Sequence, residues 1–107
     1  MDTDCLFCKI INKTIDTDFL FEDENLVVFR DINPQAPVHL LIVPKKHIRS
    51  INDLTDEDEL IIGKMCTVAR QMASKEGIAQ SGYKLLFNVE KGGGQVIFHL
   101  HMHLIGG

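Results

Sequence analysis

The sequence predicts an α+β domain with five strands, one long helix and one short helix near the N-terminus. Short runs of strand-forming residues alternate with polar or proline-containing connections, and a single long segment, residues 56–76, carries apolar residues at helical spacing. The length of 107 residues leaves room for one modest core. We therefore expect residues 1–107 to form a single domain.

The N-terminal quarter of the chain is expected to form the short helix and a hairpin. Residues 5–11 repeat apolar side chains at helical spacing, and Asp4 is placed to cap this helix. Residues 19–21 and 26–29 are short runs of strand formers that flank a charged connection. This pattern is typical of two antiparallel strands joined by a polar loop.

The middle of the chain contains a third strand and the long helix. The third strand is expected at residues 38–43, where Pro44 ends it. The long helix is expected at residues 56–76, with Thr55 as its cap and Gly77 as its stop. Two further strands are expected at residues 83–88 and 98–105.

The apolar face of the long helix is wider than a surface helix needs. It comprises Ile61, Ile62, Met65, Cys66, Val68, Ala69, Met72 and Ala73. Either the helix meets a second surface, such as another subunit, or it lies deep in its own core. We expect Cys66, within this face, to be a small core residue.

Composition and charge exclude several classes of protein. The sequence is 45% hydrophobic and 24% charged, as in soluble globular proteins, and its net charge is −4. An acidic chain does not favour binding nucleic acid through a broad basic face, and no apolar run reaches the ~20 residues that a membrane span needs. The acidic start lacks the features of a secretory signal, and an odd count of three cysteines fits a reducing compartment. We therefore expect a cytoplasmic protein with no nucleic-acid or membrane partner.

The segment most informative about function has three alternating histidines, His99, His101 and His103. In a strand this alternation places all three imidazoles on one face. Imidazoles gathered in this way can bind a metal, or can act as nucleophile, acid and base. A run of three glycines, residues 92–94, precedes them, and its backbone N–H groups can converge on an anion such as phosphate. A neutral imidazole is a competent nucleophile near pH 7 without any metal.

Several segments together resemble the histidine triad (HIT) superfamily of nucleotide hydrolases and transferases, and in particular its Hint branch, the histidine triad nucleotide-binding proteins. They are the histidine segment 99–105, residues 29–39 with their Pro-Gln-Ala-Pro sequence, Pro-Lys-Lys-His-Ile at 44–48, Gly-Gly-Gln at 93–95 and the final Gly-Gly. The resemblance implies a HIT-like fold, a five-stranded antiparallel sheet with one long and one short helix, and a homodimer across which the sheet continues.

The same resemblance implies a purine nucleoside phosphoramidase. Such an enzyme hydrolyses the P–N bond of nucleoside 5′-phosphoramidates, the amine derivatives of AMP or GMP, through a nucleotidyl-histidine intermediate. By position, His101 would be the nucleophile, His103 would contact the phosphate, and His99 would orient the nucleophile through its backbone, with His39 as a further catalytic partner. The remaining nucleotide contacts implied are Asp31 for the ribose, Ile32 for the base, and Asn88 with the backbone of Gly94, Gln95 and Val96 for the phosphate.

One residue departs from the Hint pattern. A Ser or Thr usually follows Gly-Gly-Gln, and Val96 stands in its place. Loss of one hydroxyl contact to a charged group costs about 1.5–3 kcal/mol, or roughly one to two powers of ten in rate. We therefore expect activity to survive, but either to be weaker or to depend on the basicity of the leaving amine.

A structural zinc site is also expected. Cys5 and Cys8 form a C-x-x-C pair, which supplies half of a tetrahedral site. The resemblance to family members that begin with a C-x-x-C pair implies that His47 and His99 complete the set of four zinc ligands. A zinc ion bound there would not take part in catalysis. The residues alone leave other possibilities: two unconnected thiols, a redox pair, or a metal held by His99, His101 and His103.

Two alternatives to the enzyme remain open. In the first, the same pocket binds a purine mononucleotide with little turnover. In the second, the chain is a zinc-binding interaction protein with no nucleotide role.

Overall fold

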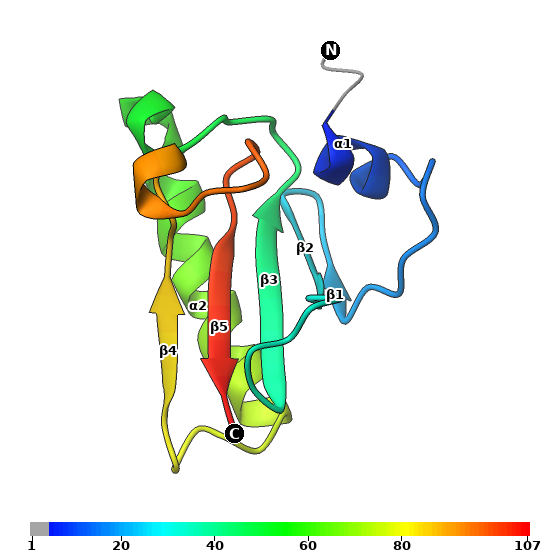
Figure 1. Cartoon of the computed structure of the whole chain (residues 1–107), viewed down its shortest axis with the longest axis vertical. Coiled ribbons are helices and arrows are strands. Elements are labelled where there is room, and N and C mark those ends of the chain that lie inside the picture. Colours follow the sequence, from blue (N-terminus) through cyan, green and yellow to red (C-terminus); the bar gives the residue numbers. More distant parts are fainter. Residues whose placement is uncertain (1–4) are drawn as a thin grey trace.

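The computed structural model describes residues 5–107, which form five strands, two α-helices and three short 3-10 turns. The helices are α1 (Leu6–Ile11) and α2 (Glu59–Lys75), and the strands are β1 (Phe21–Glu22), β2 (Leu26–Arg30), β3 (Val38–Pro44), β4 (Tyr83–Leu86) and β5 (Met102–Gly106). Every strand pair is antiparallel, and the strand order is β1-β2-β3-β5-β4 (Figure 1). The predicted α+β class, with one long and one short helix, is confirmed.

Strands β2 and β3 are buried on both faces, so neighbouring residues belong to different cores. The residues that pack with α2, which lies behind the sheet in Figure 1, include Leu26, Val28, Leu40 and Ile42. The residues that pack with α1 are Val27, Phe29, Leu41 and Val43. Each fully buried aliphatic side chain contributes about 1.5–3 kcal/mol to stability. The sheet is therefore held between α2 on one face and α1 on the other.

The predicted cap, Thr55, caps the 3-10 turn that leads into α2, and the residue at the cap of α2 itself is Asp58. The Asp58 carboxylate accepts hydrogen bonds from the Thr55 N–H at 2.9 Å and from Thr55 Oγ1 at 3.2 Å. Residues Asp56–Asp58 form a 3-10 turn, so the α-helix itself begins at Glu59 rather than at residue 56. Gly77, at φ 77°, follows the C-terminal end and stops the helix as predicted.

The expectation that Cys66 is a core residue is wrong. The buried residues of α2 are Met65, Val68, Ala69, Met72 and Ala73, with Ile61 and Ile62 half-buried against the same core. Cys66 is exposed, because one face of the helix satisfies the core and Cys66 lies outside it. The extra width predicted for the apolar face is therefore partly solvent-exposed in this chain.

The last strand is shorter than predicted. It begins at Met102, so His99 and His101 precede it instead of lying on it. In the register that pairs Ile42 with Met102, Leu100 would lie two positions further along, opposite Pro44, which has no N–H to donate. The Leu100 N–H instead bonds the carbonyl of Ile48 at 2.6 Å.

The capping residue of α1 is Cys5, whose Sγ accepts a hydrogen bond from the Cys8 N–H at 3.1 Å. The cap predicted from sequence, Asp4, lies outside the described residues. Within residues 5–107 the structure has no helix with the length and hydropathy of a membrane span.

Candidate functional site

A cavity of about 380 Å³ opens between α1, the β2–β3 connection, the segment before β5 and the glycine loop, which we define as residues 90–96. A volume of this order suits a small-molecule ligand. Seven residues predicted for the site line it: Asp31, Ile32, Asn88, Gly94, Val96, His101 and His103. His39, Gln95 and His99 do not line it, and their positions are described below.

The sequence interpretation missed the apolar wall of this cavity. The wall is formed by Leu6, Phe7, Ile10, Phe29, Leu41 and Ile97. The helical spacing of Leu6 and Ile10 was visible in the sequence, but spacing alone does not separate a ligand-facing residue from an ordinary core residue. An apolar wall with a few polar groups is the usual composition of a site for a small-molecule ligand.

Hydrogen bonds indicate which ring nitrogen carries the proton in the neutral forms of His39 and His103. The Gln35 N–H donates to His39 Nδ1 at 3.1 Å, so neutral His39 carries its proton on Nε2. That nitrogen lies 2.9 Å from His103 Nδ1 and 3.4 Å from the Asp31 carboxylate. His103 Nδ1 accepts, and neutral His103 therefore carries its proton on Nε2. These contacts leave the Nε2–H of His103, a residue that lines the cavity, as a hydrogen-bond donor.

His101 has the opposite arrangement. Its Nδ1 lies 2.7 Å from the carbonyl oxygen of His99, so Nδ1 carries the proton and Nε2 keeps an unshared pair. The ring is buried and packs edge-on against Phe7, with the ring centroids 5.0 Å apart. The His103 ring lies at the same centroid distance on another side. His101 thus presents an oriented, unprotonated nitrogen at the cavity.

Burial keeps the imidazoles of His101 and His103 neutral. It lowers the pKa of His101 below its ordinary value of 6.5, and it lowers the pKa of His103 to about 4. For His103 the neighbouring His101 and His39 act in the same direction, while the Asp31 carboxylate opposes them. Both rings are consequently uncharged at pH 7, as a nucleophile and its partner require.

The lowered pKa of His103 predicts a pH-dependent stability. The unfolded chain protonates His103 at a pKa of about 6.5, whereas the folded chain protonates it only at about 4. The free energy of unfolding is therefore unaffected by His103 above about pH 6.5 and decreases as the pH falls from there to about 4. After allowance for partial exposure, we expect a loss on the order of 1–2 kcal/mol. Urea unfolding at pH 7 and pH 4.5 measures it, with His103→Gln as the comparison because a glutamine takes up no proton. Equal pH dependence in the two proteins would refute the assignment.

The glycine loop differs from the expected cradle of amides. The N–H groups of Gly93 and Gln95 both donate to the Glu90 carbonyl at 3.0 Å, and that of Gly94 donates to the Lys91 carbonyl at 3.0 Å. These amides close the loop on itself. Val96 is 81% exposed at the cavity, and no hydrogen bond from its N–H is found among residues 5–107.

The side chains of Gln95 and Asn88 fasten the glycine loop. Gln95 is buried, accepts from the Glu90 N–H at 2.7 Å and donates to the carbonyls of Arg49 and Ile97 at 2.8 and 3.0 Å. Asn88 Nδ2 donates to the Gly93 carbonyl at 2.9 Å, at the edge of the cavity. The structure therefore places the Gln95 side chain in support of the loop, and Asn88 both in the support and in the lining.

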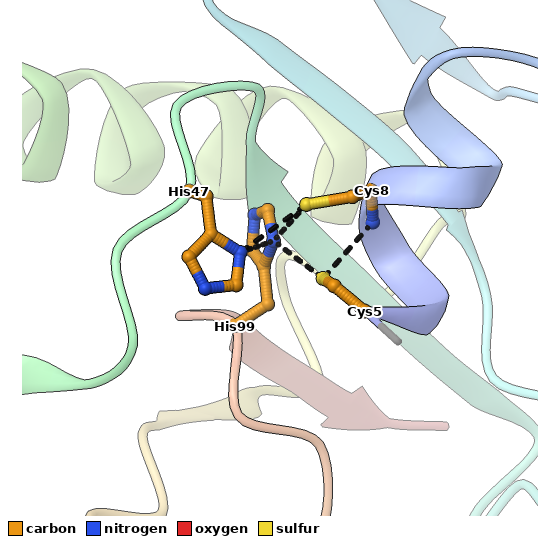
Figure 2. A group of neighbouring side chains, drawn as sticks. All are labelled: Cys5, Cys8, His47 and His99. Atoms are coloured by element: carbon orange, nitrogen blue, oxygen red, sulfur yellow. Dashed lines mark hydrogen bonds between the residues drawn. The ribbon is translucent and has the colours of Figure 1, made fainter. Parts of the chain in front are cut away.

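The predicted metal ligands Cys5, Cys8, His47 and His99 come together at one point (Figure 2), with one donor atom from each within 4.8 Å of the others. The Cys5 Sγ to His99 Nδ1 distance is 3.3 Å, Cys8 Sγ to His47 Nδ1 is 3.2 Å, and the two Nδ1 atoms are 3.1 Å apart. With zinc bonds of ~2.3 Å to sulfur and ~2.0 Å to nitrogen, the edges of a tetrahedron are ~3.3–3.8 Å. The group can hold a metal ion such as zinc.

A second-sphere contact supports this fit. His99 Nε2 lies 2.8 Å from the Pro44 carbonyl and donates to it, so the unshared pair of Nδ1 faces the two sulfurs. Burial also lowers the pKa of His99 to about 4, which keeps it in the neutral form that binds metals. In the described part of the chain, the ring nitrogens of His99, His101 and His103 do not come close enough together to bind one metal ion between them.

The two sites share α1. Cys5 and Cys8 bracket Leu6 and Phe7, which line the cavity, and the same His99 that faces the cysteines offers its carbonyl to His101. The four-residue group therefore fixes both a wall of the cavity and the segment that carries His101.

Comparisons with known proteins identify relatives of this chain. A family model described as "Scavenger mRNA decapping enzyme C-term binding" matches residues 4–107. The purine nucleoside phosphoramidase of Escherichia coli strain K12 is 46% identical over 107 residues, 100% of this chain and 90% of that protein. A HIT family hydrolase from Legionella pneumophila has a solved structure with a TM-score of 0.95 and 51% identity, over 97% of this chain and 93% of that one.

A more distant solved structure, the histidine triad nucleotide-binding protein from Candida albicans, gives a TM-score of 0.85 at 30% identity, over 94% of this chain and 73% of that one. The fold, the histidine segment and these full-length similarities all point to the same group. The chain belongs to the histidine triad (HIT) family of hydrolases.

Proposed function

We propose that this protein is a purine nucleoside phosphoramidase, which cleaves the P–N bond of AMP-amine or GMP-amine substrates. The observation that carries the proposal is the orientation of His101, whose Nδ1–H is held by the His99 carbonyl so that Nε2 is free as a nucleophile at the cavity. The name of the Escherichia coli relative supports the substrate class.

The reaction divides into two displacements. His101 Nε2 attacks the α-phosphorus, a P–N bond forms to the imidazole, and the P–N bond to the amine breaks as the amine takes a proton from solvent. Water then attacks the nucleotidyl-His101, releases the nucleoside monophosphate and restores the imidazole. The Nε2–H of His103 and the Val96 N–H are the donors proposed to stabilise the phosphoryl oxygens. Val96 offers no side-chain hydroxyl, so this stabilisation is weaker than a Ser or Thr would give.

The nucleoside half of the substrate would lie along the remaining cavity. The purine is placed against the apolar wall and Ile32, which is 89% exposed and therefore available to cover a base. The Asp31 carboxylate, at the cavity, would accept hydrogen bonds from the ribose hydroxyls. One of its oxygens is already engaged by the Asn33 N–H at 2.9 Å, which holds the carboxylate in place.

The role of Asp31 leads to a binding prediction. Asp31→Ala is expected to weaken AMP binding by about 10- to 100-fold, because hydrogen bonds to a charged group contribute about 1.5–3 kcal/mol. Titration calorimetry with AMP and 2′-deoxy-AMP measures the effect, and the variant should bind the two nucleotides almost equally. If Asp31→Ala discriminates between them as the wild type does, Asp31 does not contact the ribose.

A structural zinc ion at Cys5, Cys8, His47 and His99 is part of the proposal. Zinc would cross-link α1 to the loop after β3 and to the histidine segment, and it would take no part in the chemistry at phosphorus. Within residues 5–107 none of the three cysteines forms a disulfide, which supports a reducing, cytoplasmic location.

The function is tested by incubation with an AMP-phosphoramidate that carries a fluorogenic amine. Release of the amine together with AMP supports the enzyme. AMP binding without any release would identify a nucleotide-binding module, and zinc content without nucleotide binding would identify a metal-dependent interaction protein.

We also propose a homodimer formed through β4. This strand is the last in the sheet order, so its outer edge has no partner within residues 5–107, and Leu85 on it is 38% exposed. A second copy could pair there and continue the sheet.

Sedimentation should give twice the chain mass for the wild type, and Leu85→Asp should shift the measured mass toward that of the monomer. Ile15→Asp, at 37% exposure in the segment after α1, is the matched control and should remain dimeric. A monomeric wild type would exclude the dimer.

A further inference from the structure

Glu90 has a backbone conformation that residues other than glycine rarely adopt. Its φ is 60° and its ψ is 178°. A side chain in this region persists only where surrounding contacts hold it, and such positions concentrate at functional sites. Glu90 is the first residue of the glycine loop, directly before the Lys91–Gly93 turn.

The backbone of Glu90 closes the glycine loop. Its carbonyl accepts the N–H groups of Gly93 and Gln95, and its own N–H donates to the Gln95 side chain at 2.7 Å. The loop is thus a closed ring of hydrogen bonds between Glu90 and Gln95. This ring sets the position of the next residue, Val96, which lines the cavity.

The carboxylate of Glu90 fastens this ring to a second segment. Arg49 donates to it twice, from Nη2 at 3.0 Å and from Nε at 3.3 Å, and Ser50 Oγ donates at 2.7 Å. These donors lower the pKa of the Glu90 carboxyl, so it is ionised at neutral pH. Gln95 Nε2 returns to the same segment by donating to the Arg49 carbonyl. Both ends of the ring are therefore attached to residues 49 and 50.

The same short segment also holds the nucleophile. The Ile48 carbonyl accepts the Leu100 N–H at 2.6 Å, and Leu100 lies between His99 and His101. Residues 48–50 therefore make hydrogen bonds to the glycine loop and to the histidine segment at once. These three residues therefore couple the position of the glycine loop to that of the histidine segment.

We propose that Glu90 is a positioning residue: by binding Arg49 and Ser50, its carboxylate sets the glycine loop, and with it the Val96 amide, at the correct distance from His101. The inference rests on the proposed phosphoramidase function. Glu90 does not line the cavity, so we expect its contribution to fall on kcat rather than on nucleotide binding. A displacement of about 1 Å in such a site can cost on the order of 10²-fold in rate.

Three substitutions separate anchoring from backbone strain. Glu90→Ala removes the carboxylate and keeps a side chain at positive φ, whereas Glu90→Gly removes the carboxylate and relieves the strain. Glu90→Gln keeps an acceptor for Ser50 and Arg49. We expect Glu90→Ala and Glu90→Gly to lower kcat by about 10- to 100-fold with KM within about threefold, and Glu90→Gln to recover most of the loss. Glu24→Ala, in the exposed connection between β1 and β2, is the matched control and should behave as wild type.

The kinetics are measured well below the melting temperature of each variant, together with hydrogen exchange of the Gly93 and Gln95 amides. Faster exchange in Glu90→Ala is expected, because the ring loses its anchor. If the wild type is active and Glu90→Ala has the same kcat, the positioning role is overturned. A Glu90→Gly variant with the kcat of the wild type would overturn it as well. An inactive wild type refutes the proposed function instead. In that case the exchange data decide alone, and unchanged protection in Glu90→Ala overturns the anchoring of the loop.

Discussion

Replacing His101 with alanine is expected to lower kcat for an AMP-phosphoramidate by about four orders of magnitude or more, because the variant has no nucleophile. The Nδ1–H of His101 is held by the His99 carbonyl at 2.7 Å, and within residues 5–107 no other ring nitrogen at the cavity has the same free and oriented pair. Among residues 5–107, His103 is the other histidine that lines the cavity, and its Nδ1 is occupied by His39. Steady-state release of the amine measures the effect.

Controls are needed because the His101 ring is buried against Phe7. Circular dichroism and AMP affinity should show that His101→Ala remains folded and binds nucleotide. His103→Gln, which removes a proposed donor but leaves the nucleophile, should lower kcat by a smaller factor, about 10²-fold. A folded His101→Ala enzyme with more than about one tenth of wild-type kcat would defeat the covalent mechanism.

Removal of the metal is expected to have the second large effect, on stability. Cys5→Ser should lower the bound zinc from one ion per chain to a small fraction, because serine is a poor zinc ligand. An ion that binds the folded chain at a thousand times its Kd stabilises it by about 4 kcal/mol, which corresponds to a fall in Tm of roughly 15–30 °C on its loss. Elemental analysis and calorimetry of the same samples measure both quantities.

Cys66→Ser provides the matched control, because Cys66 is exposed and lies on α2 away from the four ligands. It should change neither the zinc content nor the Tm. Wild-type protein purified without chelator that contains no metal, or a Cys5→Ser variant that melts with the wild type, would show that the Cys and His group is not a zinc site.

The sequence could predict much of this arrangement because the informative residues are close together in the chain or belong to recognisable segments. The alternation of His99, His101 and His103 and the C-x-x-C pair are local patterns. The Thr55 cap and the Gly77 stop follow from local backbone preferences and lie where predicted. These features do not depend on distant partners.

Other features depend on contacts between distant segments and could not be predicted from the sequence. The last strand does not extend before Met102 because Leu100 would lie opposite Pro44, and this pairing becomes known only with the register of the sheet. Cys66 looked apolar by spacing, but the width of the buried face is set by how α2 meets the sheet. The glycine run looked like a cradle of amides, yet Glu90 and Lys91 use those amides to close the loop.

The central claim is that His101 forms a covalent bond to the nucleotide. It is tested most directly by quenching the enzyme with its AMP-phosphoramidate within one turnover and locating the adduct by fragmentation mass spectrometry. The account predicts AMP attached to His101, formed and lost at rates consistent with kcat, and absent in His101→Ala. Turnover at the full rate with no adduct, or an adduct on His99 or His103 instead, would contradict it.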